Sequence, residues 1–74
     1  MKISGLLYEP TQDNVNTIQD VAVKQGVKLI PFRNINNVLY LTVEGSRDTI
    51  VTYLDDIDNT GIHFDAFIDP RWSM

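Results

Sequence analysis

A histidine and a carboxylate lie close together where the sequence alternates between apolar and polar residues. His63 and Asp65 are two residues apart in the stretch 62–68, whose alternation is typical of a β-strand. Residues two apart point to the same strand face, so this pair could form a hydrogen bond or supply half of a metal site. His63 is the single histidine of the chain, and protein metal sites usually need more ligands than this pair supplies. We therefore interpret the pair as an exposed strand pair and predict no metal site.

The other residues that could perform chemistry are equally few. The chain has no cysteine, which excludes a disulfide, a thiol nucleophile and cysteine-bound zinc or iron–sulfur clusters. It also shows no glycine-rich phosphate loop, no nucleophile elbow and no paired-carboxylate motif. We therefore predict that the protein is not an enzyme and holds no cofactor.

Length and charge narrow the classes further. The 74 residues, of which 43% are hydrophobic, are enough for one small domain. The net charge of −4 argues against nucleic acid as a partner, because such binding relies on Lys and Arg. No apolar run approaches the roughly 18 residues that cross a bilayer, and the apolar run at the start is too short for a secretory signal. We expect a cytoplasmic protein with no membrane contact.

Three aspartates, Asp55, Asp56 and Asp58, lie in the last turns of a predicted helix. Carboxylates at that end oppose the helix dipole. Two interpretations stay open: an acidic patch that binds a basic partner, or a contribution to solubility alone.

The stretch 38–46 is the centre of the predicted fold. Residues 38–43 are all β-branched, aromatic or leucine, which is typical of a strand buried on at least one face. Gly45 permits a sharp turn, and Ser46 can cap a following helix. That helix should end at Gly61, and its apolar residues recur at helical spacing: Ile50, Tyr53, Leu54 and Ile57.

The same unit occurs twice, 35 residues apart. The matching pairs include the caps Thr11 and Ser46, the stop glycines Gly26 and Gly61, and Glu9 with Glu44. This repeat predicts one domain over residues 1–74, made of two pseudo-symmetric βαβ halves of about 1–35 and 36–74.

Three further strands are predicted over residues 2–9, 27–32 and 62–68. Pro31 interrupts the second, and since proline donates no ladder hydrogen bond, we expect an edge strand there. Residues 33–37 are predicted to form a polar turn. In the last strand, one face carries Ile62, Phe64, Ala66 and Ile68, and the outward face carries His63, Asp65, Phe67 and Asp69.

The order β-α-β-β-α-β with two matched halves resembles the ferredoxin-like, or split βαβ, superfold. The resemblance implies an α+β two-layer sandwich, in which a four-stranded antiparallel sheet of order 4-1-3-2 has both helices on one face. It does not imply a function, because this superfold hosts many.

In such a fold the second sheet face is open. Lys28, Ile30 and Phe32 should point outward. For the central strands, the repeat places Ile3, Gly5 and Leu7 with Val38, Tyr40 and Thr42 on the open side, whereas a one-residue slip would expose Leu6 and Tyr8 instead. Either arrangement gives an apolar face, which usually marks an interface. The alternative is that the C-terminal tail folds over it. The candidate partner-binding residues are Ile30, Phe32, Val38, Tyr40, Phe67 and Trp72.

Several families of this superfold have sequence signatures that can be compared. RNA-binding domains place a basic residue, glycine and aromatics on the third strand, and here only Tyr40 corresponds. Domains of the ACT family usually have a glycine in the first strand–helix loop, where this chain has residues 9–13 without one. The arginine and asparagine of acylphosphatases and the paired cysteines of metal chaperones are not matched.

Our leading hypothesis is a small, non-catalytic protein-interaction module that docks its open sheet face, or the edge strand 27–32, onto another protein or a second copy of itself. Such modules serve as accessory subunits or inhibitors, including those encoded by bacteriophages. The alternative is an ACT-like sensor that binds a small ligand as a homodimer. RNA binding is a less favoured alternative.

Overall fold

The computed structural model describes residues 1–67 and 70 of the chain. Six elements follow one another as β1 (Lys2–Leu7), α1 (Gln12–Gln25), β2 (Lys28–Ile35), β3 (Val38–Glu44), α2 (Arg47–Thr60) and β4 (Phe64–Ala66). All strand pairs are antiparallel, in the order β2-β3-β1-β4. The predicted α+β class and strand order are therefore confirmed, and the arrangement is compatible with the ferredoxin-like fold. Within the described residues, no helix is long and apolar enough to cross a membrane.

Both helices begin and end at the predicted residues. The hydroxyls of Thr11 and Ser46 each accept a hydrogen bond from the backbone N–H three residues later, at 3.2 Å, which satisfies a donor left free by helix geometry. Gly26 and Gly61 end the helices with φ of 74° and 80°, a left-handed conformation that glycine adopts without steric cost.

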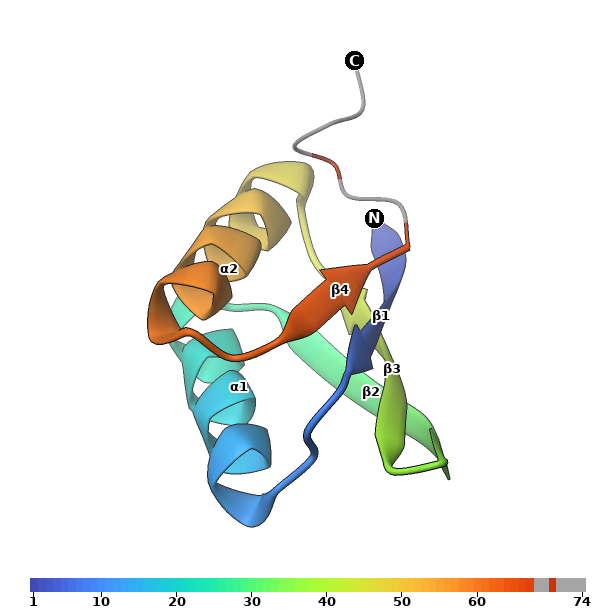
Figure 1. The fold of residues 1–74 in the computed structure, drawn as a ribbon. Helices are drawn as coiled ribbons and strands as arrows, with labels where there is room; N and C mark the ends of the chain where they lie inside the picture. Colours follow the sequence, from blue (N-terminus) through green and yellow to red (C-terminus); the bar gives the residue numbers. More distant parts are fainter. Residues whose placement is uncertain (68–69, 71–74) are drawn as a thin grey trace.

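The two helices cover one face of the sheet (Figure 1). Their apolar stripes bury Ile18 and Ala22 from α1, and Ile50, Tyr53, Leu54 and Ile57 from α2. Tyr53 lies at the centre with 0% of its surface exposed. Its hydroxyl donates to the backbone oxygen of Ile18 at 3.1 Å, so the one polar group of this ring is satisfied by the neighbouring helix.

The prediction from the repeat was wrong for β1. Ile3, Gly5 and Leu7 lie on the helix-covered face, and the alternative placement, with Leu6 and Tyr8 on the open side, is the one observed. The reason is one extra residue between β1 and α1. Leu7, the last buried residue of β1, precedes the cap Thr11 by four positions, whereas Val43 precedes Ser46 by three. A shift of 35 therefore aligns the helices, but the first strands need 36, and a one-residue change reverses the face of every side chain.

The edge position predicted for the second strand is confirmed, but its length was underestimated. β2 continues to Ile35, so the turn predicted over residues 33–37 contracts to Asn36 and Asn37. These two have φ of 53° and 62°, the geometry of a tight hairpin turn that asparagine tolerates better than most residues. The register shifts between Pro31 and Arg33, which marks a β-bulge.

The last strand is shorter than predicted. β4 covers Phe64–Ala66 rather than residues 62–68, although Phe67 still donates its backbone N–H to Ser4 at 2.9 Å. The predicted alternation holds where it can be seen: Phe64 is buried, and Asp65 and Phe67 are exposed. Ile68, Asp69 and Trp72, which the sequence analysis singled out, lie outside the described residues.

Candidate interaction surface

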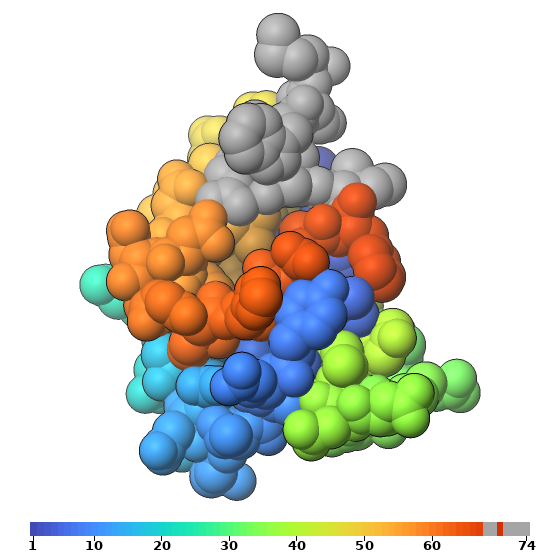
Figure 2. Space-filling view, viewed as in Figure 1, coloured from blue at the N-terminus to red at the C-terminus, as the bar shows by residue number. Residues whose placement is uncertain are grey.

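The open face is the sheet face turned away from the helices, and the strand register arranges its side chains in four rows. The first row holds Lys28, Glu44 and Lys2; the second Ile30, Thr42, Ser4 and Phe67; the third Phe32, Arg33, Tyr40, Leu6 and Asp65; the fourth Ile35, Val38, Tyr8 and His63. In Figure 2 the surface of β1 lies between that of the β4 segment and that of the β2–β3 hairpin.

The β-bulge in β2 enlarges the apolar centre of this face. Two residues of a bulged strand oppose one residue of its neighbour, so Phe32 and Arg33 both lie opposite Tyr40. The rings of Phe32 and Tyr40 are 6.1 Å apart at 59°, a favourable tilted contact. Even so, Phe32 keeps 59% of its surface exposed and Phe67 keeps 60%. Two phenylalanines are thus left largely in water although the core is closed.

One corner of the open face is polar, and its side chains contact one another. The Tyr8 hydroxyl donates to Oδ2 of Asp65 at 2.9 Å, and the Tyr8 ring lies 5.2 Å from the ring of His63. The hydrogen bond to the Asp65 carboxylate, followed by burial and nearby negative charge, raises the pKa of Tyr8. The His63–Asp65 pair predicted from the sequence is therefore part of a three-residue cluster. Its third member is Tyr8, whose hydroxyl is hydrogen-bonded to the Asp65 carboxylate. Among residues 1–67 and 70, no three metal-ligating side chains come together.

Charges occupy the opposite end of the face. Lys28, Glu44 and Lys2 lie side by side across β2, β3 and β1. Opposite charges in neighbouring strand positions attract one another weakly when exposed. This row separates the apolar centre from solvent at that end.

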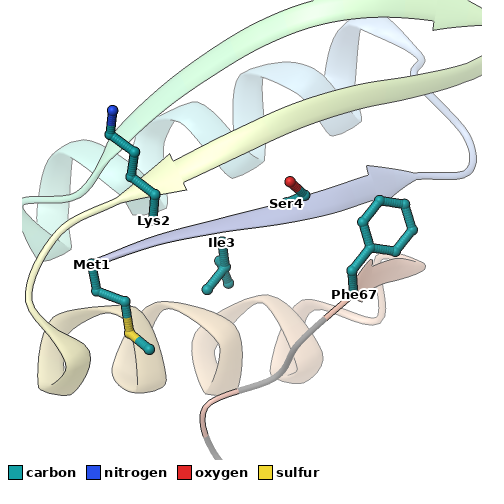
Figure 3. A pocket seen from close by; sticks show the side chains of 5 residues that line it. All are labelled: Met1, Lys2, Ile3, Ser4 and Phe67. Carbon is teal, nitrogen blue, oxygen red and sulfur yellow. The ribbon is translucent and has the colours of Figure 1, made fainter.

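A hollow of about 390 Å³ adjoins the charged row where β4 ends. Figure 3 shows Lys2, Ser4 and Phe67 on the open-face side of this hollow, and Met1 and Ile3 directed toward α2. Its lining is mostly apolar, and its two polar residues are Lys2 and Ser4. The hollow thus extends the open face along β1 past the end of β4.

The three aspartates of α2 lie in the helix layer rather than on the open face. Asp56 is half-buried and accepts a hydrogen bond from Nε2 of Gln25 at 2.6 Å, so this carboxylate joins the two helices. Asp55 and Asp58 are exposed. Asp56 therefore has a structural role that the acidic-patch interpretation did not include.

The structure brings together five of the six residues predicted to bind a partner. Ile30, Phe32, Val38, Tyr40 and Phe67 share the open face, and Trp72 lies outside the described residues. Sequence reasoning missed Arg33 and Ile35, which had been placed in a turn. Their signal was Pro31, because a proline within a strand often accompanies a bulge.

Comparison of the chain with models of known protein families, with curated proteins and with solved structures found no match.

Proposed function

We propose that this chain is a small, non-catalytic protein-interaction module that binds a protein through its open sheet face. The observation that supports this most is the exposure of Phe32 and Phe67, 59% and 60%, on the same face as Tyr40 and Leu6. In such a role the chain acts by occupying a surface of its partner, as an accessory subunit or an inhibitor does.

The composition of the open face favours docking over simple solvation. An antiparallel sheet with one covered face usually presents polar side chains to water on the other. Here the middle rows present Ile30, Tyr40 and Leu6 together with the two exposed phenylalanines. Burial of apolar surface is worth roughly 25 cal/mol per Å², and rigid aromatic residues often anchor protein interfaces. A partner that covers these rows would therefore gain affinity.

The free edge of β2 is less suited to binding than the face. Gly45 donates its N–H to the carbonyl of Met1 at 3.0 Å, so by the alternation of antiparallel ladders the odd-numbered residues of β3 bond to β1 and the even-numbered ones to β2. Ile30, opposite Thr42, therefore bonds inward, and Pro31 directs its nitrogen to the free edge. Because proline has no N–H, and because the bulge follows it, this edge is a poor template for another strand.

The test compares threonine substitutions on the two sides of the molecule. Ile30→Thr and Tyr40→Thr replace apolar side chains of the open face and keep residue types that suit a strand. Val23→Thr, at a position 71% exposed on α1, is the matched control. Circular dichroism first establishes that all variants are folded.

Two readouts follow: the solution mass over a range of concentrations, and the binding of any protein that the immobilised wild-type chain retains. We expect the wild-type chain to associate. Both open-face variants should weaken this association, and Val23→Thr should leave it unchanged. Association that is indifferent to the open-face variants, or the absence of any association, would contradict it.

A further inference from the structure

We propose that the open face pairs with the open face of a second copy of this chain, about a twofold axis that runs parallel to the strands between β1 and β3. This inference rests on the proposed function and names the partner. The positions of the charged residues support it. Under this rotation, charged residues of one copy meet residues of opposite charge in the other copy.

The rotation exchanges β1 with β3 and β2 with β4, and it keeps each row in place. In the third row, Arg33 at one end of the row then meets Asp65 of the second copy. In the first row, Glu44 meets Lys2 of the second copy. Because the interface is isologous, each of these opposite-charge pairs forms twice.

The apolar positions match under the same rotation. Ile30, on β2, faces Phe67 of the second copy, which extends β4 in the same row. Tyr40 faces Leu6 next to the axis. Rows of apolar side chains flanked by complementary charges are the arrangement of a specific interface, with an apolar centre and a polar rim.

The other in-plane twofold axis, perpendicular to the strands, gives a poor fit. It would place the first row against the fourth, so that Glu44 would meet Val38 and Lys28 would meet Ile35 of the second copy. That arrangement would cover charged side chains with apolar ones and give them no new partner of opposite charge, which is unfavourable. Only the axis parallel to the strands pairs Glu44 and Arg33 with opposite charges, and it leaves Lys28 at the margin.

The contacts within one copy are compatible with this pairing. Asp65 uses Oδ2 to accept from Tyr8, and a carboxylate has further acceptor positions for a guanidinium. Arg33 and Asp65 are both exposed, so neither has to leave a buried position. Two sheets that stack face to face lie about 10 Å apart with nearly aligned strands. Side chains of this size can fill that space.

The size of the face is typical of a weak or transient interface. The four strands lie about 4.8 Å apart and together hold 24 residues of about 3.4 Å each, so they cover roughly 400 Å². This is less than the roughly 800 Å² per partner of a standard interface. We therefore expect a dissociation constant of the order of 10–100 μM rather than a permanent dimer.

The experiment is a charge exchange followed by sedimentation equilibrium. Arg33→Asp places two carboxylates opposite each other in the homodimer, and Asp65→Arg places two guanidinium groups opposite each other. Each variant alone should dimerise roughly tenfold more weakly than the wild type, because two pairs are lost per dimer. In an equimolar mixture of the two variants, both pairs are again of opposite charge, so the mixed dimer should regain the wild-type affinity.

Controls and outcomes separate this inference from the proposed function. Lys24→Asp and Asp20→Arg reverse charges in the same way at exposed positions of α1, and both should leave the dissociation constant of the dimer unchanged. If the wild type stays monomeric up to about 1 mM, or if mixing restores no affinity, the inference is wrong. A dimer that Tyr40→Thr disrupts but charge exchange leaves unchanged would overturn this axis and leave the proposed function standing. Weakening by single exchanges and recovery on mixing would support the inference.

Discussion

A single methyl group added at Gly5 should strain the core, and the structure gives the size of the effect. A Cβ at this position would lie 2.6 Å from Cζ of Phe64, 3.0 Å from its Cε1 and 3.2 Å from the backbone oxygen of Asp65. The Phe64 ring cannot move away easily, because it is 8% exposed and packs edge-on against Tyr53, with 6.4 Å between ring centroids. Gly5 therefore leaves the space that the ring fills.

Overpacking of this kind costs about 1–3 kcal/mol, and the loss of glycine's freedom in the unfolded chain offsets roughly 0.5 kcal/mol of it. Gly5→Ala should therefore lower the free energy of unfolding by about 0.5–2.5 kcal/mol, which corresponds to roughly 2–20 °C in Tm for a domain of this size. Urea and thermal unfolding followed by circular dichroism measure both quantities. Ser4→Ala, the neighbouring change on the open face, should have a much smaller effect.

A double-mutant cycle tests the stated cause. In a Phe64→Leu background the ring is absent, so Gly5→Ala should cost less than it does in the wild type. An equal cost in both backgrounds would mean that the alanine does not strain the protein through Phe64. A neutral or stabilising Gly5→Ala would refute the packing described for this strand pair.

Burial raises the pKa of Tyr53 above its ordinary value of 10.0, so the contribution of this group to stability is complete below pH 10.0 and declines above it by up to about 1.4 kcal/mol per pH unit. Urea titrations of Tyr53→Phe should show a shallower alkaline decline, and identical slopes would contradict this. Asp65→Asn removes the charged acceptor of Tyr8, so NMR titration should show a lower pKa for Tyr8; an unchanged pKa would mean that the hydrogen bond does not form in solution. Asn37, with φ of 62°, should tolerate glycine within about 0.5 kcal/mol but lose about 1 kcal/mol on change to alanine, as measured by urea unfolding; equal stabilities would exclude the tight turn.

Much of the fold could be predicted because single residues mark its boundaries. Capping hydroxyls and left-handed glycines act within one turn of a helix, so Thr11, Ser46, Gly26 and Gly61 identify both helices from local chemistry alone. Pro31 likewise identified the edge strand, because a residue without an N–H is confined to edge strands, strand starts and bulges.

The open face was predicted less well, because the face to which a strand residue points depends on its exact position in the strand. One additional residue between β1 and α1 places the side chains of β1 on the faces opposite to those predicted. The alignment of the two halves without a gap concealed this residue. The bulge after Pro31 had the same effect in β2, where it moved Arg33 from an expected turn to the open face. Insertions of one residue cost little energy locally and leave almost no trace in composition, so they become visible only when the strands are paired.

The most direct test of the central claim, that the open face binds a second copy, is the solution mass of the wild-type chain and of Tyr40→Thr measured by sedimentation equilibrium from about 1 μM to about 1 mM. We expect a wild type that is monomeric at the low end and becomes dimeric as the concentration rises, and a Tyr40→Thr variant that remains monomeric over the same range. A wild type that is monomeric throughout, or a dimer of equal strength in both proteins, would contradict it.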